Sequence, residues 1–222
     1  ATYIEGIDFS TTENLLIGKS NITSTGLFSG LVDELKIFPY ALTDDQIRDE
    51  YNLGSAAVMG TGPNVAPPAG GALSDSLVAH WTFDEQSGQT AHDKIGENNG
   101  ILGQSTASGS DDPTWKSEDN CKVHGCLAFG GGDVIDMGTN NALDLSSALT
   151  VSAWAYHTSS TNNGYVIAKR DPTLSQNQYG MYIANSGNLY FTGPQTIDTD
   201  YDLPAQTWTH LSMVVDGTSL KT

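Results

Sequence analysis

Apolar and polar residues alternate with a period of two in several short stretches of the chain, which predicts β-strands. The pattern is clearest in residues 149–157, LTVSAWAYH. Successive side chains of a strand point to opposite faces, so every second residue here should face a core. The apolar set is Leu149, Val151, Ala153 and Ala155, and the outward set is Thr150, Ser152, Trp154 and Tyr156.

Other strand-like stretches are separated by turn residues such as Ser87-Gly88 and Asn99-Gly100. They lie at residues 1–9, 13–18, 26–38, 77–83, 125–138, 165–170, 179–184, 188–193 and 208–217. With 24 Gly and 8 Pro in 222 residues, the composition suits strands joined by turns better than helices. The pattern therefore predicts an all-β sandwich or barrel.

One short helix is predicted near 43–52, directly after the strand in residues 26–38. Pro39 ends that strand because it lacks a backbone donor. Thr43 and Gln46 have the spacing of a capping box, and Gly54 is placed to end the helix. Ile47 and Tyr51, four residues apart, should pack on the sheet. Within the strand, Asp33 and Glu34 would be costly to bury without partners.

The charge balance excludes some classes of function. Nine Lys and Arg stand against 26 Asp and Glu, a net charge of −17. Nucleic-acid binding is not expected, because neutralising phosphates needs clustered basic residues. No apolar run approaches the ~18 residues of a membrane-spanning helix, so no membrane span is expected. The acidity favours cation binding.

The two cysteines, Cys121 and Cys126 in CKVHGC, are predicted to form a disulfide. A disulfide would indicate an oxidising, extracellular compartment. One alternative is a zinc site with His124, which lacks a fourth ligand at zinc spacing. The other is a pair of reduced cysteines on adjacent turns.

Three motifs resemble one family. WTFDEQSG (81–88), LTVSAWAYH (149–157) and GLFSGLVDELKIFPYALTDDQIRDEYNLG (26–54) are similar to the first, central and closing segments of laminin-G-like (concanavalin A-like) jelly-roll domains of bacterial surface proteins. The resemblance implies a two-sheet antiparallel jelly-roll sandwich. The closing segment normally ends such a domain, but here it lies near the beginning of the chain.

This order predicts three parts. Residues 1–54 form the C-terminal third of the jelly roll, 55–76 a linker, and 77–222 the first two-thirds. The linker is rich in Ala, Gly, Pro and Ser, and can join neighbouring strands as a coil. We expect residues 1–54 to close onto their own chain, as in a circular permutant. In the alternative, a register-shifted tandem array, they complete a neighbouring copy by strand exchange.

The resemblance also implies a structural calcium (Ca²⁺) that bridges the closing and first segments. Position by position, its ligands would be Asp33 in VDELKIF, Asp84 in WTFDE and Asp93 in AHDK. Calcium requires six to eight oxygens, which carboxylates, carbonyls and water supply. The alternative is that these carboxylates are solvated at strand ends. Asp198, Asp200 and Asp202 are expected to lie in a solvated acidic loop.

Aromatic and amide side chains alternate onto one expected concave face and predict a glycan site. Aromatic rings stack on sugars, while amides and charges bind hydroxyls. The candidate residues are Trp154, Tyr156, Lys169, Asn177, Gln178, Tyr182 and Tyr190. The alternative for Trp154 is a place in the core.

Catalysis is not expected, because no HExxH, GxSxG, P-loop or paired-carboxylate glycosidase motif is present. We therefore expect an extracellular, non-catalytic module that binds glycans or cell-surface proteins. One alternative is a structural subunit of a cell-surface filament that self-associates by strand exchange. Another is an accessory carbohydrate-binding domain of a glycoside-active enzyme.

Overall fold

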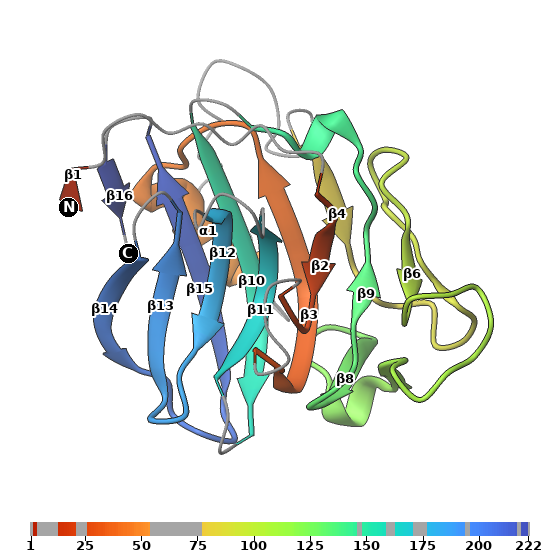
Figure 1. Ribbon diagram of the computed structural model, residues 1–222. Helices are drawn as coiled ribbons and strands as arrows, with labels where there is room; N and C mark the ends of the chain where they lie inside the picture. The colour runs from red at the N-terminus through yellow and green to blue at the C-terminus, as the bar shows by residue number, and fades with distance from the viewer. Residues whose placement is uncertain are drawn as a thin grey trace, which may run out of the picture.

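A computed structural model describes residues 2–3, 13–20, 26–53, 77–145, 148–158, 163–170, 177–193, 196–216 and 219–221. Gly54 and the predicted linker 55–76 lie outside these ranges. Within them the chain forms strands and short helices (Figure 1). In chain order these are β1 (Thr2–Tyr3), β2 (Leu15–Ile17), β3 (Ser29–Phe38), α1 (Asp44–Leu53), β4 (Ala79–Trp81), β5 (Thr90–Ala91), β6 (Gly100–Leu102), β7 (Thr114–Lys116), the 3-10 helix η2 (Glu118–Asn120), β8 (Cys126–Gly130), β9 (Ile135–Asp136), the 3-10 helix η3 (Asn141–Leu143), β10 (Leu149–His157), β11 (Gly164–Arg170), β12 (Asn177–Ile183), β13 (Asn188–Thr192), β14 (Thr196–Asp202), β15 (Trp208–Val215) and β16 (Ser219–Lys221).

The strands form two antiparallel sheets, which confirms the predicted sandwich. Sheet A has the order β1-β16-β15-β10-β3-β8-β7, with β4 also paired to β3. Sheet B has the order β14-β13-β12-β11-β2-β9-β6-β5 and lies in front of sheet A in Figure 1.

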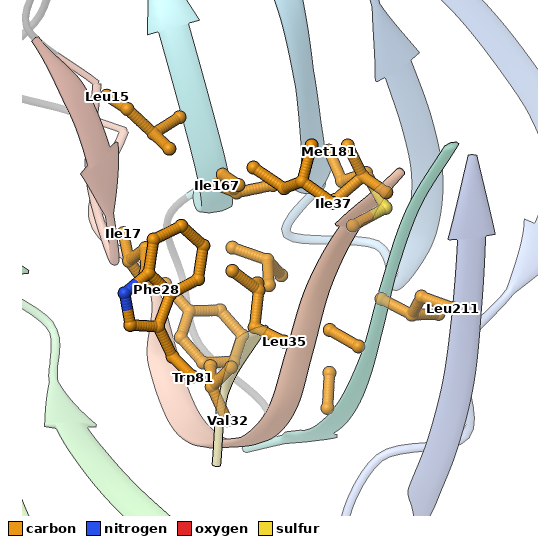
Figure 2. Close-up of a cluster of buried hydrophobic side chains, with 14 of the residues drawn as sticks. Leu15, Ile17, Phe28, Val32, Leu35, Ile37, Trp81, Ile167, Met181 and Leu211 are labelled. Carbon is orange, nitrogen blue, oxygen red and sulfur yellow. The ribbon is translucent and has the colours of Figure 1, made fainter. Parts of the chain in front are cut away.

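The core lies between the sheets. Figure 2 shows Val32, Leu35 and Ile37 of β3 in one cluster with Ile167 and Met181 of sheet B. The four inward residues predicted for β10 all belong to this core. The alternation in residues 149–157 thus identified the buried face of the central strand correctly.

The early segment 26–53 is integrated into sheet A. β3 pairs with β10 on one side and with β4 and β8 on the other. Strands far apart in the sequence thus surround it, and Trp81 of β4 is fully buried beside it. The division into 1–54, 55–76 and 77–222 and the exchange of strands between neighbouring chains remain predictions.

Helix α1 starts with the predicted capping box. The backbone N–H of Gln46 donates to Thr43 Oγ1 at 3.3 Å, and the N–H of Thr43 donates to Gln46 Oε1 at 2.9 Å. Two helix-end donors are thereby satisfied. The helix packs on the outer face of sheet A, where the ring of Tyr51 lies 5.3 Å from that of Trp154.

One predicted loop is a strand. Asp198, Asp200 and Asp202 lie in β14, which pairs with β13 and forms the edge of sheet B. The period-two acidic pattern fits an edge strand, since alternating charges there oppose pairing with another chain. The expectation of a loop was wrong because Asp is depleted in strands overall, and the edge position outweighed that tendency.

Candidate functional site

A row of three tyrosines crosses the outer face of sheet B. The register places Tyr165 of β11 opposite Tyr182 of β12, and Tyr182 opposite Tyr190 of β13. The residues on either side of Tyr182 and Tyr190 belong to the core, so these rings point outward. Ring centroids are 5.2 Å apart for Tyr165 and Tyr182, and 4.7 Å for Tyr182 and Tyr190. We call these three residues the tyrosine row.

Charged groups of opposite sign lie at the two ends of the tyrosine row. Arg170 Nη1 donates to the hydroxyl of Tyr165 at 2.6 Å, and its guanidinium carbon lies 5.3 Å from the ring centroid. At the other end, Asp198 stands opposite Tyr190 in the register. A hydrogen bond to Asp198 raises the pKa of the Tyr190 hydroxyl. The row thus runs from a cation to an anion.

The hydroxyls of the row stay protonated at physiological pH. Burial, followed by the neighbouring Tyr165 and Tyr190, raises the pKa of Tyr182 to about 12. Burial also raises the pKa of Tyr165, against the lowering effect of Arg170. The rings of Tyr182 and Tyr190 are stacked at 6°. Because stacked rings cover each other's faces, the row presents edges and hydroxyls to a ligand.

The structure does not bring the predicted glycan residues onto one face. Tyr182 lies in the tyrosine row, and Tyr156 and Trp154 lie on the other sheet. Lys169 of β11 is 0% exposed and points into the sandwich. Asn177 and Gln178 begin β12, but their side chains lie outside the described residues.

Sequence reasoning missed Tyr165, Arg170 and the pairing that forms the row. The signal available in the sequence was that each of the three stretches that form β11, β12 and β13 contains a tyrosine at an outward position. Which residues stand opposite each other, however, depends on strand register, and the β11–β12 pairing has an irregularity between Tyr165 and Ile167.

Trp154 lies on the outer face of sheet A beneath α1. It is 3% exposed and contacts the rings of Tyr51 and His210. Lys122 Nζ lies 4.1 Å from the centroid of its ring. Trp154 thus joins α1 and the loop 121–126 to the sheet. Tyr156 pairs instead with Trp208, at 5.7 Å between ring centroids.

A polar network surrounds a small cavity of about 60 Å³ beside Trp154. Lys36 Nζ donates to Glu50 Oε2 at 2.6 Å and lies 3.7 Å from Glu34 Oε2. Glu34 Oε2 also lies 2.7 Å from His80 Nε2. These two partners hold the pKa of Glu34 below its usual value despite burial. The network gives the buried charges of α1 and β3 their partners.

Asp33, a predicted calcium ligand, is 0% exposed and accepts hydrogen bonds from the loop 121–126. Its Oδ2 receives the backbone N–H groups of Lys122 at 3.0 Å and Val123 at 2.8 Å. Its Oδ1 is buried without a hydrogen-bond partner. Burial, with smaller contributions from Glu34 and Asp84, raises the pKa of Asp33 to about 8. The carboxyl group therefore holds its proton near neutral pH.

The same loop contacts Asp84. Its Oδ1 accepts the backbone N–H of Gly125 at 2.8 Å. A Cβ at Gly125 would lie 2.8 Å from the carbonyl oxygen of Phe83, so only glycine allows this approach. The predicted disulfide Cys121–Cys126 is confirmed and closes the loop. Asp33 and Asp84 therefore share one disulfide-closed loop as their donor.

Asp93 is separate from this loop. Its carboxylate accepts from the backbone N–H groups of His80, Ile95 and Asn98 and from the amide of Asn98, at 2.8–3.2 Å. Within the described ranges, no group of three His, Cys, Asp or Glu side chains could hold a metal. The donors around Asp93 fit a carboxylate that organises its own turn. The calcium site stays a prediction, and it now depends on Asp33 Oδ1 and Asp84.

Strained backbone conformations occur around this loop. Glu34, Phe83 and His124 have φ values of 50°, 58° and 48°, in the left-handed region that non-glycine residues seldom adopt. Glu34 and Leu35 lie together opposite Ala153, between the pairs Lys36–Ser152 and Asp33–Trp154. This β-bulge lets Val32 and Leu35, three residues apart, both face the core. It also directs Asp33 and Glu34 toward the outer face.

Comparison with known proteins gives one family match, in the C-terminal part of the chain. Residues 129–222 match the family model described as the concanavalin A-like lectin/glucanases superfamily. No curated protein and no solved structure matches the chain. The matched segment contains β10 to β15, which contribute strands to both sheets and carry the tyrosine row. Residues 129–222 are thus similar to laminin-G-like domains of the concanavalin A-like superfamily, and the two-sheet sandwich is consistent with that fold.

Proposed function

We propose that this domain is an extracellular, non-catalytic module that binds glycans through the tyrosine row on the outer face of sheet B. The family is one of carbohydrate- or protein-binding modules. The observation that carries the proposal is the register of Tyr165, Tyr182 and Tyr190 on adjacent strands. Helix α1 packs on sheet A and so does not cover this face of sheet B, on which Tyr165 is 9% exposed.

The chemistry of the row fits a ligand with many hydroxyls. Protonated phenols both donate and accept hydrogen bonds, and the flanking Arg170 and Asp198 add one donor and one acceptor group. Strands lie roughly 4.8 Å apart, so three adjacent residues present a line about 10 Å long. An oligosaccharide that lies across the strands would meet a hydroxyl at each step.

An extracellular location is supported by the disulfide, because such bonds persist in oxidising compartments. No helix in the described part of the chain is long and apolar enough to cross a membrane.

A Ser–His contact could indicate a catalytic nucleophile, but the contact that lies beneath α1 is unsuited to catalysis. Ser152 Oγ lies 2.9 Å from His210 Nε2. Ser152 is only 1% exposed, so a substrate has no access to its hydroxyl. Burial, with the nearby Lys36 and Lys122, lowers the pKa of His210 to about 4, which makes it a weak base.

Binding is favoured over filament formation by the edge of sheet B. The edge strand β14 carries Asp198, Asp200 and Asp202. Alternating carboxylates on an edge oppose the addition of another acidic strand. A filament built through β14 would place these charges against a copy of the same acidic chain.

Loss of the ring of Tyr182 should weaken glycan binding strongly. We expect Tyr182→Ala to weaken the best-retained ligand of a glycan array by at least tenfold, as removal of a central contact residue does. Tyr182→Phe should weaken binding less, because the stacking with its neighbours stays. Titration calorimetry with that glycan would measure both dissociation constants.

Tyr51→Ala is the matched control, since Tyr51 is an exposed aromatic residue of α1, which packs on the other sheet. It should leave the dissociation constant unchanged. Equal loss in both variants, or no retention of the wild-type protein on any glycan, would contradict the proposed site.

A further inference from the structure

The ammonium group of Lys169 is enclosed in the interior of the sandwich. The residue is 0% exposed, and its Nζ lies 3.0 Å from Asp144 Oδ1. Nζ also donates to the backbone carbonyl of Glu13 at 2.8 Å. Tyr179, fully buried in β12 opposite Lys169, donates its hydroxyl to the carbonyl of Leu143, the residue before Asp144.

The contact between Lys169 and Asp144 is an ion pair without hydrogen-bond alignment. Asp144 Oδ1 is buried and has no hydrogen-bond partner, although the amine nitrogen lies 3.0 Å away. By contrast, Lys36 Nζ makes an aligned hydrogen bond to Glu50 Oε2. The amine of Lys169 therefore lies beside the carboxyl group of Asp144 without a hydrogen bond to Oδ1.

The enclosure of Lys169 and Asp144 by the sandwich makes it costly for both side chains to carry a charge. Removing an ammonium and a carboxylate from water costs several kcal/mol per ion, which the pair recovers only with good geometry and further hydrogen bonds. Transfer of one proton within the pair gives a neutral amine next to a neutral carboxylic acid. Nζ lies 3.0 Å from Oδ1, which is bonded to the Cγ atom, and groups held next to each other in this way behave as if at very high concentration.

We propose that Lys169 and Asp144 condense to an intramolecular isopeptide bond. The lone pair of the neutral Nζ attacks Cγ of the Asp144 carboxylic acid, and a C–N bond forms. One carboxyl oxygen then leaves with a proton from the amine, so amine and acid give an amide and one water. No oxidant or cofactor is required.

The surroundings are compatible with the product. The new amide keeps one N–H, which can still donate to the carbonyl of Glu13. The side chain of Asp144 is 20% exposed, which gives the departing water a route to solvent. The bond would join the residue that follows η3 to the central strand β11. The inference is independent of the proposed glycan site, because neither residue belongs to the tyrosine row.

Intact-mass spectrometry of the reduced full chain tests the proposal. The wild-type protein should be lighter than its sequence mass by about 18 Da, the mass of one water, and a digest should yield one peptide pair joined through Lys169 and Asp144. Lys169→Met and Asp144→Ala should both show the full sequence mass. Asp144→Asn can form the same amide by losing ammonia, so its product should have the same mass as the wild-type product.

Lys36→Met is the matched control, because Lys36 is a second buried, ion-paired lysine. It should keep the mass deficit. A wild-type chain that shows its full sequence mass after folding and prolonged incubation would overturn the proposal, as would a deficit that maps to another residue pair. Since the wild-type protein supplies this result, poor folding of a variant does not obscure it.

Discussion

Asp33→Asn should stabilise the protein at pH 9 and have little effect at pH 4. Burial raises the pKa of Asp33 in the folded state to about 8, against 3.8 for a solvent-exposed aspartate. Between these values the folded state holds a proton that the unfolded state has released. Unfolding is therefore increasingly favoured as pH rises from about 4 to about 8, and the penalty is constant above that.

The expected gain follows from this difference. A shift of about four pKa units corresponds to roughly 5 kcal/mol as an upper limit, so a few kcal/mol should be recovered at pH 9. For a domain of this size that raises the melting temperature by about 5–10 °C. The amide oxygen can accept the N–H groups of Lys122 and Val123, and the amide nitrogen replaces the unpartnered Oδ1. Calorimetry at pH 4, 6, 8 and 9 would measure the trend.

Asp93→Asn is the matched control. Asp93 receives four hydrogen-bond donors, so an amide loses acceptor capacity there and should lower the melting temperature at pH 9. If Asp33→Asn also lowers the melting temperature at pH 9, then the carboxylate of Asp33 is ionised and fully hydrogen-bonded in the folded protein. The raised pKa of Asp33 would then be wrong.

If calcium binds at Asp33, it should remove the destabilisation that ionised Asp33 causes at high pH. A cation favours the carboxylate, so about 5 mM calcium, above the ~0.1–1 mM dissociation constants typical of extracellular sites, should raise the wild-type melting temperature at pH 8. The Asp33→Asn variant should not respond. A wild-type melt that is the same in calcium and in chelator would contradict the calcium prediction and leave the pH argument intact.

Glu50→Ala should destabilise the domain by about 3 kcal/mol, since breaking a buried pair leaves an uncompensated charge. Lys36 would keep only the contact to Glu34 at 3.7 Å. Because Glu50 joins α1 to sheet A, the helix should separate from Trp154 in the variant. The indole of Trp154 would then be exposed to water, and the fluorescence of Trp154 should shift to longer wavelength. Urea unfolding followed by fluorescence would measure both effects.

The double variant Lys36→Met, Glu50→Leu is the control for this prediction. It removes both charges and fills the space with apolar side chains, so it should recover most of the lost stability. Equal destabilisation of the single and double variants would show that Lys36 has adequate partners without Glu50. The loss would then come from helix packing alone.

The candidate site was predicted only in part. Tyr182 and Tyr190 were identified as ligand residues, whereas Tyr165 and Arg170 were not. Lys169 was expected at the same face, yet it points into the sandwich beside Asp144. The reason is local: period-two alternation assigns faces within one strand, but an irregularity in pairing, such as that between Tyr165 and Ile167, reverses the assignment beyond it.

The sequence by itself determined the features that depend on nearby residues. The buried face of β10, the capping box of α1 and the Cys121–Cys126 disulfide each depend on residues within ten positions of one another. The all-β class followed from the same kind of pattern, repeated along the chain.

Only the tertiary structure decided which distant residues meet. The bulge at Glu34 directs Asp33 toward the loop 121–126, and the register of β11, β12 and β13 aligns the tyrosine row. Both depend on strand pairing, in which a shift of one residue exchanges the faces of a strand. The free energy that selects one register comes from the whole core, and no single segment of the sequence contains it.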